Sequence, residues 1–336
     1  MVRFGIIGTG RISDWVLRGA AQDPRIKVTA VCSRTVAAAE AFIVRNPIAE
    51  GARVYTSVEE MVADPQVDAV YVGTPNQTHC GYTIAALTAG KHVLCEKPLA
   101  INATEGRKMI EAARKSGCLL MEAMVSTLNP NFLEVASRIK EIAPVHNYSS
   151  YFCQYSSKFE ALKRGEVATA FKSGTAGALR DVGVYTLYPL VALFGRPKTV
   201  SGKLYTVTTT EGASDVHGVA CLGYDDMDAM LTWSKTYDSF QPTEIAGENG
   251  NLILDEIHIA RKAEIVPHAA PTSGQGPKPG RTLLSEGLPY NEYYYEFKEF
   301  ADLIDQGKTE SYHNSLETSL SVLEIIDRLL SNGLYL

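Results

Sequence analysis

Apolar positions in the first third of the chain fall in short runs, separated by segments whose apolar residues recur with a helical period. The run Val2–Ile7 predicts a buried strand, and Trp15, Leu17 and Ala20 beyond it have helical spacing. Similar runs and helical segments alternate from there to about residue 124. Because strands that alternate with helices are typical of a doubly wound parallel sheet, we expect a Rossmann domain over residues 1–124.

The pattern changes in the remainder of the chain, where long β-type runs replace the regular alternation. These runs cover residues 145–155, 199–210, 218–224 and 229–236. They predict that residues 125–336 form an α+β domain with a large, open, mostly antiparallel sheet. Two final helices are expected at about 291–305 and 314–330, and a segment rich in Pro and Gly, 267–280, predicts an exposed loop.

A glycine-rich turn directly follows the first strand. Gly8 permits a tight turn, and Gly10 lets the backbone approach a pyrophosphate at the N-terminus of the next helix. Ser13 occupies the third glycine position of G-x-G-x-x-G, so the motif is a variant, but strand, turn and helix come in the required order. The alternative is an ordinary strand-to-helix turn. The residues assigned to the cofactor here are Gly8, Thr9, Gly10, Arg11 and Ile12.

The residues that follow the second strand predict which dinucleotide binds. A Rossmann domain that prefers NAD usually has an Asp or Glu there, on the ribose 2′-hydroxyl. This chain has Ser33 and Arg34, a hydroxyl and a guanidinium suited to a 2′-phosphate. We therefore expect NADP to be preferred. If Arg34 instead stacks on the adenine, NAD fits as well.

Two later strand ends add polar residues that suit the ligand crevice of such a sheet. Thr74, Pro75 and Asn76 form one turn, for which the alternative is a helix entry capped by Asn76 or Thr78. We expect His79 to brace this turn rather than to act as an acid or base. The next strand ends in Glu96-Lys97-Pro98, from which Lys97 could reach the reactive end of a bound nicotinamide. The alternative there is a solvated Glu–Lys pair.

These motifs together resemble the Gfo/Idh/MocA oxidoreductase family over essentially the whole chain. The stretches that carry the resemblance are GTGRI at 8–12, TPNQTH at 74–79, GKHVLCEKP at 90–98, GTAGALRDVGVYTL at 174–187, IAGENGNLILD at 245–255 and NSLETSL at 314–320. The resemblance implies that Lys97 is the catalytic lysine, that Glu96 and Lys97 border the cofactor, and that a cis peptide bond precedes Pro98. Some of the relatives that it implies are dimeric, which favours a dimer for this chain too.

One departure within the family motif favours a particular branch. Where many members have Asp-x-x-x-His, this chain has Asp181 followed by Tyr185, which resembles the dimeric dihydrodiol dehydrogenase and xylose dehydrogenase branch. A free tyrosine has a pKa of about 10, and a lysine cation within about 4–6 Å lowers it. We expect Tyr185 to exchange the proton with Lys97 beside it. Asp181 lies on the same helical face and could hold Lys97 or bind a substrate hydroxyl; the alternative for Tyr185 is a core residue.

Composition and charge limit the kinds of molecule that this protein is expected to bind. The chain has 336 residues and a formal charge of −6, which argues against nucleic acid as a main partner. Its six cysteines include no C-x-x-C pair, and no cluster of His, Cys or carboxylate residues has metal-ligand spacing. No apolar run is long enough to span a bilayer. We expect a cytoplasmic protein without a metal. Further pocket candidates are Trp15, Phe152, Phe159, Arg180 and Trp233.

The sequence thus predicts an NAD(P)-dependent oxidoreductase that transfers a hydride between nicotinamide and a carbinol or carbonyl carbon. The polyhydroxylated substrate is expected to be a sugar, a polyol or a cyclic diol, and a homodimer is expected through the C-terminal sheet. Alternatives are an NAD-dependent inositol-type dehydrogenase, a non-catalytic NAD(P)-binding regulator of the same fold, and a hydrolase or lyase that keeps NAD tightly bound.

Overall fold

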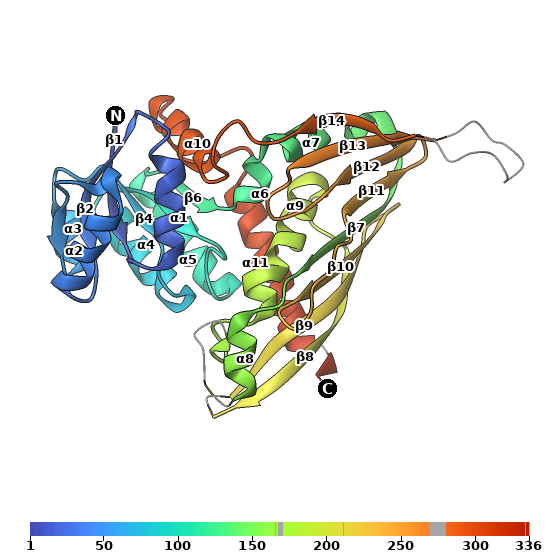
Figure 1. Cartoon of the computed structure of the whole chain (residues 1–336), viewed down its shortest axis with the longest axis horizontal. Helices are drawn as coiled ribbons and strands as arrows, with labels where there is room; N and C mark the ends of the chain where they lie inside the picture. The colour runs from blue at the N-terminus through green and yellow to red at the C-terminus, as the bar shows by residue number, and fades with distance from the viewer. Residues whose placement is uncertain (165, 167–170, 211, 269–279, 333, 336) are drawn as a thin grey trace, which may run out of the picture. The chain divides into compact units, whose positions relative to one another are not determined.

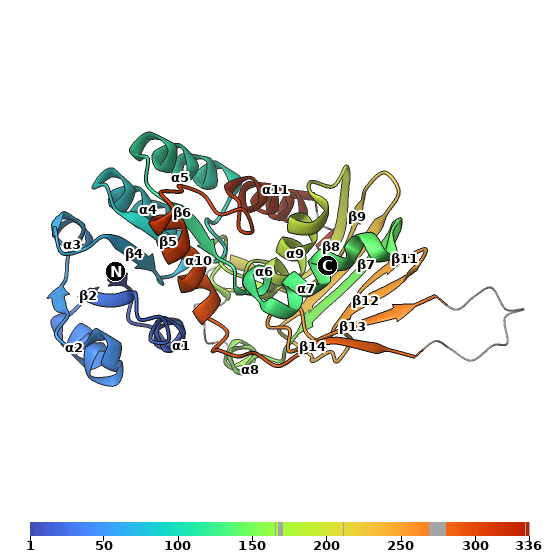
Figure 2. The same cartoon turned by 90° about the horizontal axis from the view of Figure 1, so that it is seen from above.

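The chain forms two compact units in the computed structural model, which describes residues 1–164, 166, 171–210, 212–268, 280–332 and 334–335 (Figures 1 and 2). The first unit comprises residues 1–125 and 289–323, and the second comprises 126–288 and 324–336. We expected one domain boundary after residue 124, which assigns residues 289–323 to the second domain. In the structure these residues belong to the first unit.

The first unit contains a parallel sheet in the order β3-β2-β1-β4-β5-β6, which is the strand order of a Rossmann fold and confirms that expectation. Its strands are β1 (Val2–Ile7), β2 (Ile26–Cys32), β3 (Arg53–Tyr55), β4 (Ala69–Val72), β5 (His92–Glu96) and β6 (Leu120–Ala123). β4 is buried along its whole length, as expected of a central strand with helices on both faces.

Helices cover both faces of this sheet. They are α1 (Arg11–Ala20), α2 (Val36–Arg45), α3 (Val58–Ala63), α4 (His79–Thr88), α5 (Ala103–Ser116) and α10 (Tyr294–Asp305), with 3₁₀ turns at Pro47–Ala49 and Asn76–Thr78. Figure 2 shows α4 and α5 on the face opposite α1. The side chains of α3, α4 and α5 share one hydrophobic cluster with Val70, Val72 and Val93 of the sheet.

The returning segment 289–323 contributes to both faces, with α10 on the face of α1 and the start of the next helix beside α5. The ring of Phe297 in α10 lies 5.2 Å from that of Phe4 in β1, edge to face. Gly19 of α1 lies so close to the backbone at Tyr293 that a Cβ atom there would collide with it. The helix that follows, α11 (Leu316–Asn332), begins in this unit, where Leu323 packs against Gly106 of α5. The sheet would otherwise expose Phe4 to water.

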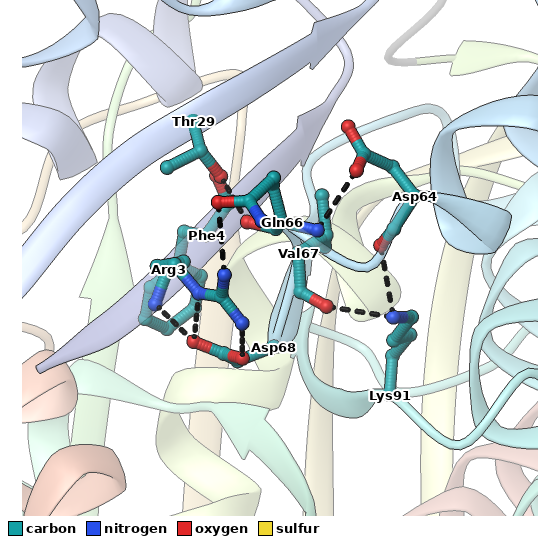
Figure 3. Close-up of polar contacts among 8 residues, drawn as sticks. All are labelled: Arg3, Phe4, Thr29, Asp64, Gln66, Val67, Asp68 and Lys91. Carbon is teal, nitrogen blue, oxygen red and sulfur yellow. Dashed lines mark hydrogen bonds and ion pairs between the residues drawn. The ribbon is translucent and has the colours of Figure 1, made fainter.

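Polar contacts tie the loop before β4 to the start of β1 (Figure 3). The Arg3 guanidinium donates to both carboxylate oxygens of Asp68, at 2.8 and 2.5 Å, and thereby lowers the pKa of that carboxyl. Lys91 donates to the carbonyl oxygens of Asp64 (3.0 Å) and Val67 (2.7 Å). These contacts lie at the amino ends of the parallel strands, and the carboxyl ends carry the glycine turn.

The second unit contains a sheet to which the described residues contribute nine strands, in the order β14-β13-β12-β11-β7-β10-β9-β8-β15. The strands are β7 (Val145–Cys153), β8 (Thr199–Thr209), β9 (Gly212–Gly223), β10 (Asp228–Ser234), β11 (Thr243–Gly247), β12 (Gly250–Leu254), β13 (Lys262–Pro267), β14 (Thr282–Glu286) and β15 (Leu334–Tyr335). The pairs β10–β7 and β15–β8 are parallel and the others antiparallel, which confirms the predicted type of sheet.

Helices cover one face of this sheet. They are α7 (Pro130–Ile142), α9 (Val184–Phe194) and the end of α11, with α6 (Val125–Leu128) and α8 (Ser157–Lys163) in the connections. Trp233 of β10 is fully buried against Gly183, directly before α9, and Gly202 of β8 is covered by Leu329 of α11. On the other face Val219 and Met230 are 45% and 51% exposed.

Several predicted bounds are shifted. β9 begins at Gly212 rather than at 218, and the predicted turn at residues 74–76 leads through a 3₁₀ turn into α4, which begins at His79. Most of the loop predicted at 267–280 lies outside the described residues. Where the structure describes the chain, none of its helices is both long and apolar enough to cross a bilayer.

Candidate functional site

The glycine turn joins β1 to α1. Gly8 has φ +101°, and a Cβ atom there would collide with the carbonyl group of Gly73, at the end of β4. Gly10 precedes α1 with an ordinary φ of −82°, and a Cβ atom there would meet nothing within 4 Å. Gly8 is therefore required by the packing of the protein itself, whereas the space over Gly10 is open to a ligand.

The start of α1 has the features of a pyrophosphate site. No side chain at the N-cap accepts a hydrogen bond from the first-turn amides of α1, and these amides favour an anion. Ser13, at the third motif position, is fully buried against Gly73 and closes the helix onto the sheet. Arg11 and Gly10 are exposed, and Thr9 and Ile12 half-buried, so the residues present fit a dinucleotide phosphate.

The carboxyl end of β2 borders the same turn. The hydroxyls of Thr9 and Ser33 are hydrogen-bonded at 3.0 Å, and Arg34 is exposed beside Ser33. Sequence reasoning missed Arg45, the last residue of α2, whose Nη2 donates to the carbonyl oxygen of Thr9 (2.8 Å) while Nε donates to Asp14 (2.8 Å). No local pattern distinguishes this arginine from other surface arginines.

His79 connects two of the turns that the motifs predicted. Its ring is fully buried, with Nδ1 3.0 Å from the carbonyl oxygen of Pro98 and Nε2 2.9 Å from that of Thr74. Burial lowers the pKa of His79 most strongly and the Lys97 cation adds to this, whereas the contacts with the two carbonyl oxygens raise it; the net shift is downward. Thr78 stands at the N-cap of α4, but its hydroxyl donates to the Pro75 carbonyl, so the expected side-chain cap is not formed there.

Residues 93–100 are buried, except for Lys97, which is half-buried. The peptide bond between Lys97 and Pro98 is cis, as the resemblance implied. Glu96 accepts hydrogen bonds from the Tyr71 hydroxyl (2.7 Å) and from the Lys97 amide (3.2 Å), and Glu122 accepts one from the Leu99 amide (2.9 Å). The lysine thus projects from a turn that buried carboxyl groups hold on both sides.

Glu122 was missed by the sequence reasoning. Its side chain is 1% exposed, and burial raises its pKa to about 7. Glu296 of α10 is also 1% exposed, and its pKa is raised well above the usual range, first by burial and then by Glu96. No sequence pattern identifies such residues, because their burial depends on elements distant in the chain.

In the second unit, Asp181 and Tyr185 come from one helical segment. A π-helical turn, Leu179–Gly183, leads into α9. From residue 177 to 191 every residue is buried except Asp181 and Tyr185, which keep partial solvent access. Tyr185 is therefore not the fully buried core residue of the alternative reading, and two polar side chains four residues apart share the accessible side of the segment.

Aromatic rings surround Tyr185 within the same unit. Phe152 of β7 contacts it edge to face with 5.3 Å between ring centroids, and His258 lies at 6.2 Å. Phe152 and His258 are themselves stacked at 4.3 Å. Phe152 was a predicted pocket residue, whereas His258, in the turn between β12 and β13, was missed.

Asp181 forms an ion pair with Lys235, directly after β10, and Lys235 was also missed. Arg180, a predicted pocket residue next to Asp181, is buried, with 7% of its surface exposed. Lys97 belongs to the first unit and Tyr185 and Asp181 to the second, and their cooperation stays a prediction. Within the described residues no three His, Cys, Asp or Glu side chains gather as a metal site would require.

The remaining pocket candidates have different surroundings. Trp233 is fully buried in the core, and Phe159 packs with Leu162 and Phe171. Trp15 is 39% exposed, with the Arg11 guanidinium 5.0 Å from the centre of its ring. Trp15 thus remains beside the glycine turn as a candidate contact.

Comparison with known proteins identifies the family. Residues 2–124 match the model of the oxidoreductase family with an NAD-binding Rossmann fold, and residues 138–253 match the GFO/IDH/MocA C-terminal domain. The chain is 37% identical to scyllo-inositol 2-dehydrogenase (NADP(+)) IolU of Bacillus subtilis over 97% of its own length and 95% of that protein. It is 28% identical to trans-1,2-dihydrobenzene-1,2-diol dehydrogenase of Danio rerio over 97% and 95%.

A solved structure shows the same fold. The 3-ketoreductase KijD10 from Actinomadura kijaniata, in complex with NADP and TDP-benzene, superimposes with a TM-score of 0.84 at 23% identity, over 100% of this chain and 99% of that one. The family models and the named relatives confirm the nicotinamide cofactor and the class of enzyme, and the solved structure confirms the fold. The chain belongs to the GFO/IDH/MocA oxidoreductases, a family of NAD(P)-dependent enzymes.

Proposed function

We propose that this protein transfers a hydride between NADP and a carbinol or carbonyl carbon of a neutral sugar, polyol or cyclic diol. The observation that carries the proposal is the pair of accessible polar side chains, Asp181 and Tyr185, on an otherwise buried helical segment. The names of the relatives support the substrate class, because they act on an inositol and on a cyclic diol.

Each candidate residue has a separate role in the proposed reaction. A bound nicotinamide supplies or accepts the hydride, and a proton must then move on the substrate oxygen. Tyr185 exchanges that proton, and the Lys97 ammonium favours the phenolate and polarises the substrate oxygen. Asp181 accepts a hydrogen bond from a neighbouring hydroxyl and so orients the reacting carbon. The first-turn amides of α1, with Gly8 and Gly10, hold the pyrophosphate.

NADP is proposed as the preferred cofactor. Arg34 is exposed beside Ser33 at the end of β2, and no carboxylate follows that strand to hold a ribose 2′-hydroxyl. The relative from Bacillus subtilis is named for NADP(+). Arg34→Ala should raise the dissociation constant of NADPH at least about tenfold and that of NADH little. Equal losses for both would contradict the 2′-phosphate role.

Activity is tested by cofactor reduction at 340 nm on aldoses, polyols, inositols and cyclic diols, with NADP and NAD in parallel. Lys97→Met and Tyr185→Phe should bind NADPH as the wild type does and lose at least about a hundredfold in kcat. The control is Lys172→Met, an exposed lysine of the second unit. Cofactor binding with no turnover in either direction would favour the non-catalytic regulator.

We also propose a cytoplasmic homodimer formed through the face of the large sheet that carries no helix in the described residues. Val219 and Met230 stand on this face, and Cys221, the neighbour of Met230 across the strand pair, is exposed as well. Sedimentation equilibrium should give a dimer in the wild type, and Val219→Lys with Met230→Lys should give a monomer. A monomeric wild type would refute this assembly.

A further inference from the structure

Lys235 is a lysine in an unusual place for a strongly hydrated side chain. It follows β10, and the backbone around it is held firmly: its amide donates to the Val216 carbonyl (2.9 Å), and its carbonyl accepts from Ser156 (3.0 Å). Its side chain is 7% exposed. The ammonium group lies 5.5 Å from the centre of the Phe171 ring. A cation so placed is stable only with an anionic partner, since burying an unpaired charge costs several kcal/mol.

The ion pair between Lys235 and Asp181 is asymmetric in its exposure. The carboxylate of Asp181 is 40% exposed, whereas the ammonium of Lys235 is almost completely covered. A molecule that approaches this side of the π-helical turn therefore meets the carboxylate first. A carboxylate has about four lone-pair positions, so the contact with Lys235 does not by itself saturate it as an acceptor.

The turn that carries Asp181 is itself anchored by a second carboxyl group. Asp215 of β9, which is 4% exposed, accepts a hydrogen bond from the Leu179 amide at the start of the turn (2.6 Å). Gly177, with φ +118°, leaves room for Asp215, because a Cβ atom there would collide with the carboxylate. Burial raises the pKa of Asp215 to about 6, whereas the Leu179 amide and the nearby cations Arg180 and Lys235 oppose this rise. Backbone and charge together thus fix where Asp181 stands.

We propose that Lys235 is a positioning residue, which holds the Asp181 carboxylate in place as a double acceptor and so makes the site selective for neutral vicinal diols over sugar acids and phosphosugars. The proposal rests on the function proposed above. A carboxylate accepts hydrogen bonds from two adjacent hydroxyls but repels an anionic group at the same place. Lys235 acts through Asp181 and makes no contact with the reacting atoms.

The kinetic test is a double-mutant cycle with Lys235→Met, Asp181→Asn and the combination. Lys235→Met should raise KM for the best polyol at least about tenfold, with kcat changed less than about threefold and NADPH binding unaltered. Lys235→Arg, which keeps the charge, should recover part of the loss. The effects should be strongly non-additive, since each variant removes the same pair. Additive effects, or an unchanged KM in Lys235→Met, would overturn the proposal.

Specificity gives a second readout. In Asp181→Asn the Lys235 cation remains without its carboxylate, so the ratio of kcat/KM for an aldonate to that for the neutral sugar should rise at least about tenfold. The combined variant lacks the cation, and its ratio should return towards that of the wild type. A ratio that stays the same in Asp181→Asn contradicts the selectivity role.

Thermal unfolding without substrate separates this inference from the proposed function. Asp181→Asn removes the ion-pair partner of a buried cation and should lower Tm clearly, whereas Lys235→Met leaves a carboxylate that water still reaches and should lower Tm less. Adding Lys235→Met to Asp181→Asn should recover Tm. If the cycle shows this recovery but no polyol is turned over, the pair stands and the proposed function fails. If Tm changes are additive, the inference fails whatever the activity.

Discussion

The surroundings of Glu122 predict how its ionisation changes the free energy of unfolding, and they give the magnitude of that change. The carboxyl group lies at the end of β6 and accepts a hydrogen bond from the Leu99 amide, two residues beyond Lys97. Burial raises its pKa from the ordinary 4.5 to about 7; Glu96 adds to the rise and Lys97 opposes it. The folded protein therefore keeps a proton there that the unfolded chain releases at a lower pH.

The sign and magnitude follow from proton linkage. Because the pKa is higher in the folded state, the stability that this group contributes is fully present below pH 4.5 and is lost as pH rises through about 7. One unit of pKa corresponds to about 1.4 kcal/mol, so ionised Glu122 costs about 3 kcal/mol by pH 8. Glutamine keeps an acceptor for the Leu99 amide and does not ionise. Glu122→Gln should thus be more stable than the wild type by about 3 kcal/mol at pH 8 and about equal to it at pH 4.5.

Urea unfolding of the cofactor-free protein at intervals from pH 4.5 to 8 measures this difference. Other buried carboxyls, such as Asp215 with a pKa of about 6, titrate in the same range, so the difference between variant and wild type is the relevant quantity. Glu111→Gln on the exposed side of α5 is the control and should run parallel to the wild type. If Glu122→Gln also runs parallel, Glu122 is ionised in the folded protein at no cost and the reasoning is refuted.

Two comparisons of glycines test the packing around the site. Gly8→Ala should lower the free energy of unfolding of the cofactor-free protein by about 2 kcal/mol or more, because Gly8 has φ +101° and faces the Gly73 carbonyl. Gly10→Ala should change it by less than about 1 kcal/mol yet weaken NADPH binding, which calorimetry would measure; similar stability losses in both would contradict the distinction. Gly183→Ala should cost about 1–3 kcal/mol, since a Cβ atom would press on Trp233 at 3.0 Å. Gly81→Ala, in the first turn of α4 where a Cβ atom would meet nothing within 4 Å, should stabilise by up to about 0.5–1 kcal/mol. Urea unfolding decides this pair, and a neutral Gly183→Ala would show that Trp233 can move aside.

Much of the fold could be predicted because its signals are local. Val2–Ile7, the glycine turn and the helix after it lie in consecutive residues, and their apolar period and turn chemistry suffice to predict strand, turn and helix. The type of the large sheet follows in the same way from long β runs that do not alternate regularly with helices. Element ends were less accurate, as at β9, because a strand ends where its pairing partner does.

Some of the candidate site residues could be proposed from the sequence for a related reason. Lys97, Asp181 and Tyr185 belong to motifs that can be recognised along the chain. Arg45, Glu122, Lys235 and His258 do not, and each acquires its role from a contact with a residue far away in sequence. Lys235 is an ordinary lysine until β10 brings it beside Asp181 and covers it.

The sequence by itself determined the family, the dinucleotide turn at Gly8 and Gly10, and the polar residues Ser33 and Arg34 where an acidic residue would favour NAD. These properties depend on residue types at fixed spacing. Only the tertiary structure decided that residues 289–323 cover the Rossmann sheet, that Asp181 pairs with a buried cation and that burial raises the pKa of Glu122. The burial of a side chain and its charged partners depend on every element packed around it, so they cannot be predicted from a short stretch of sequence.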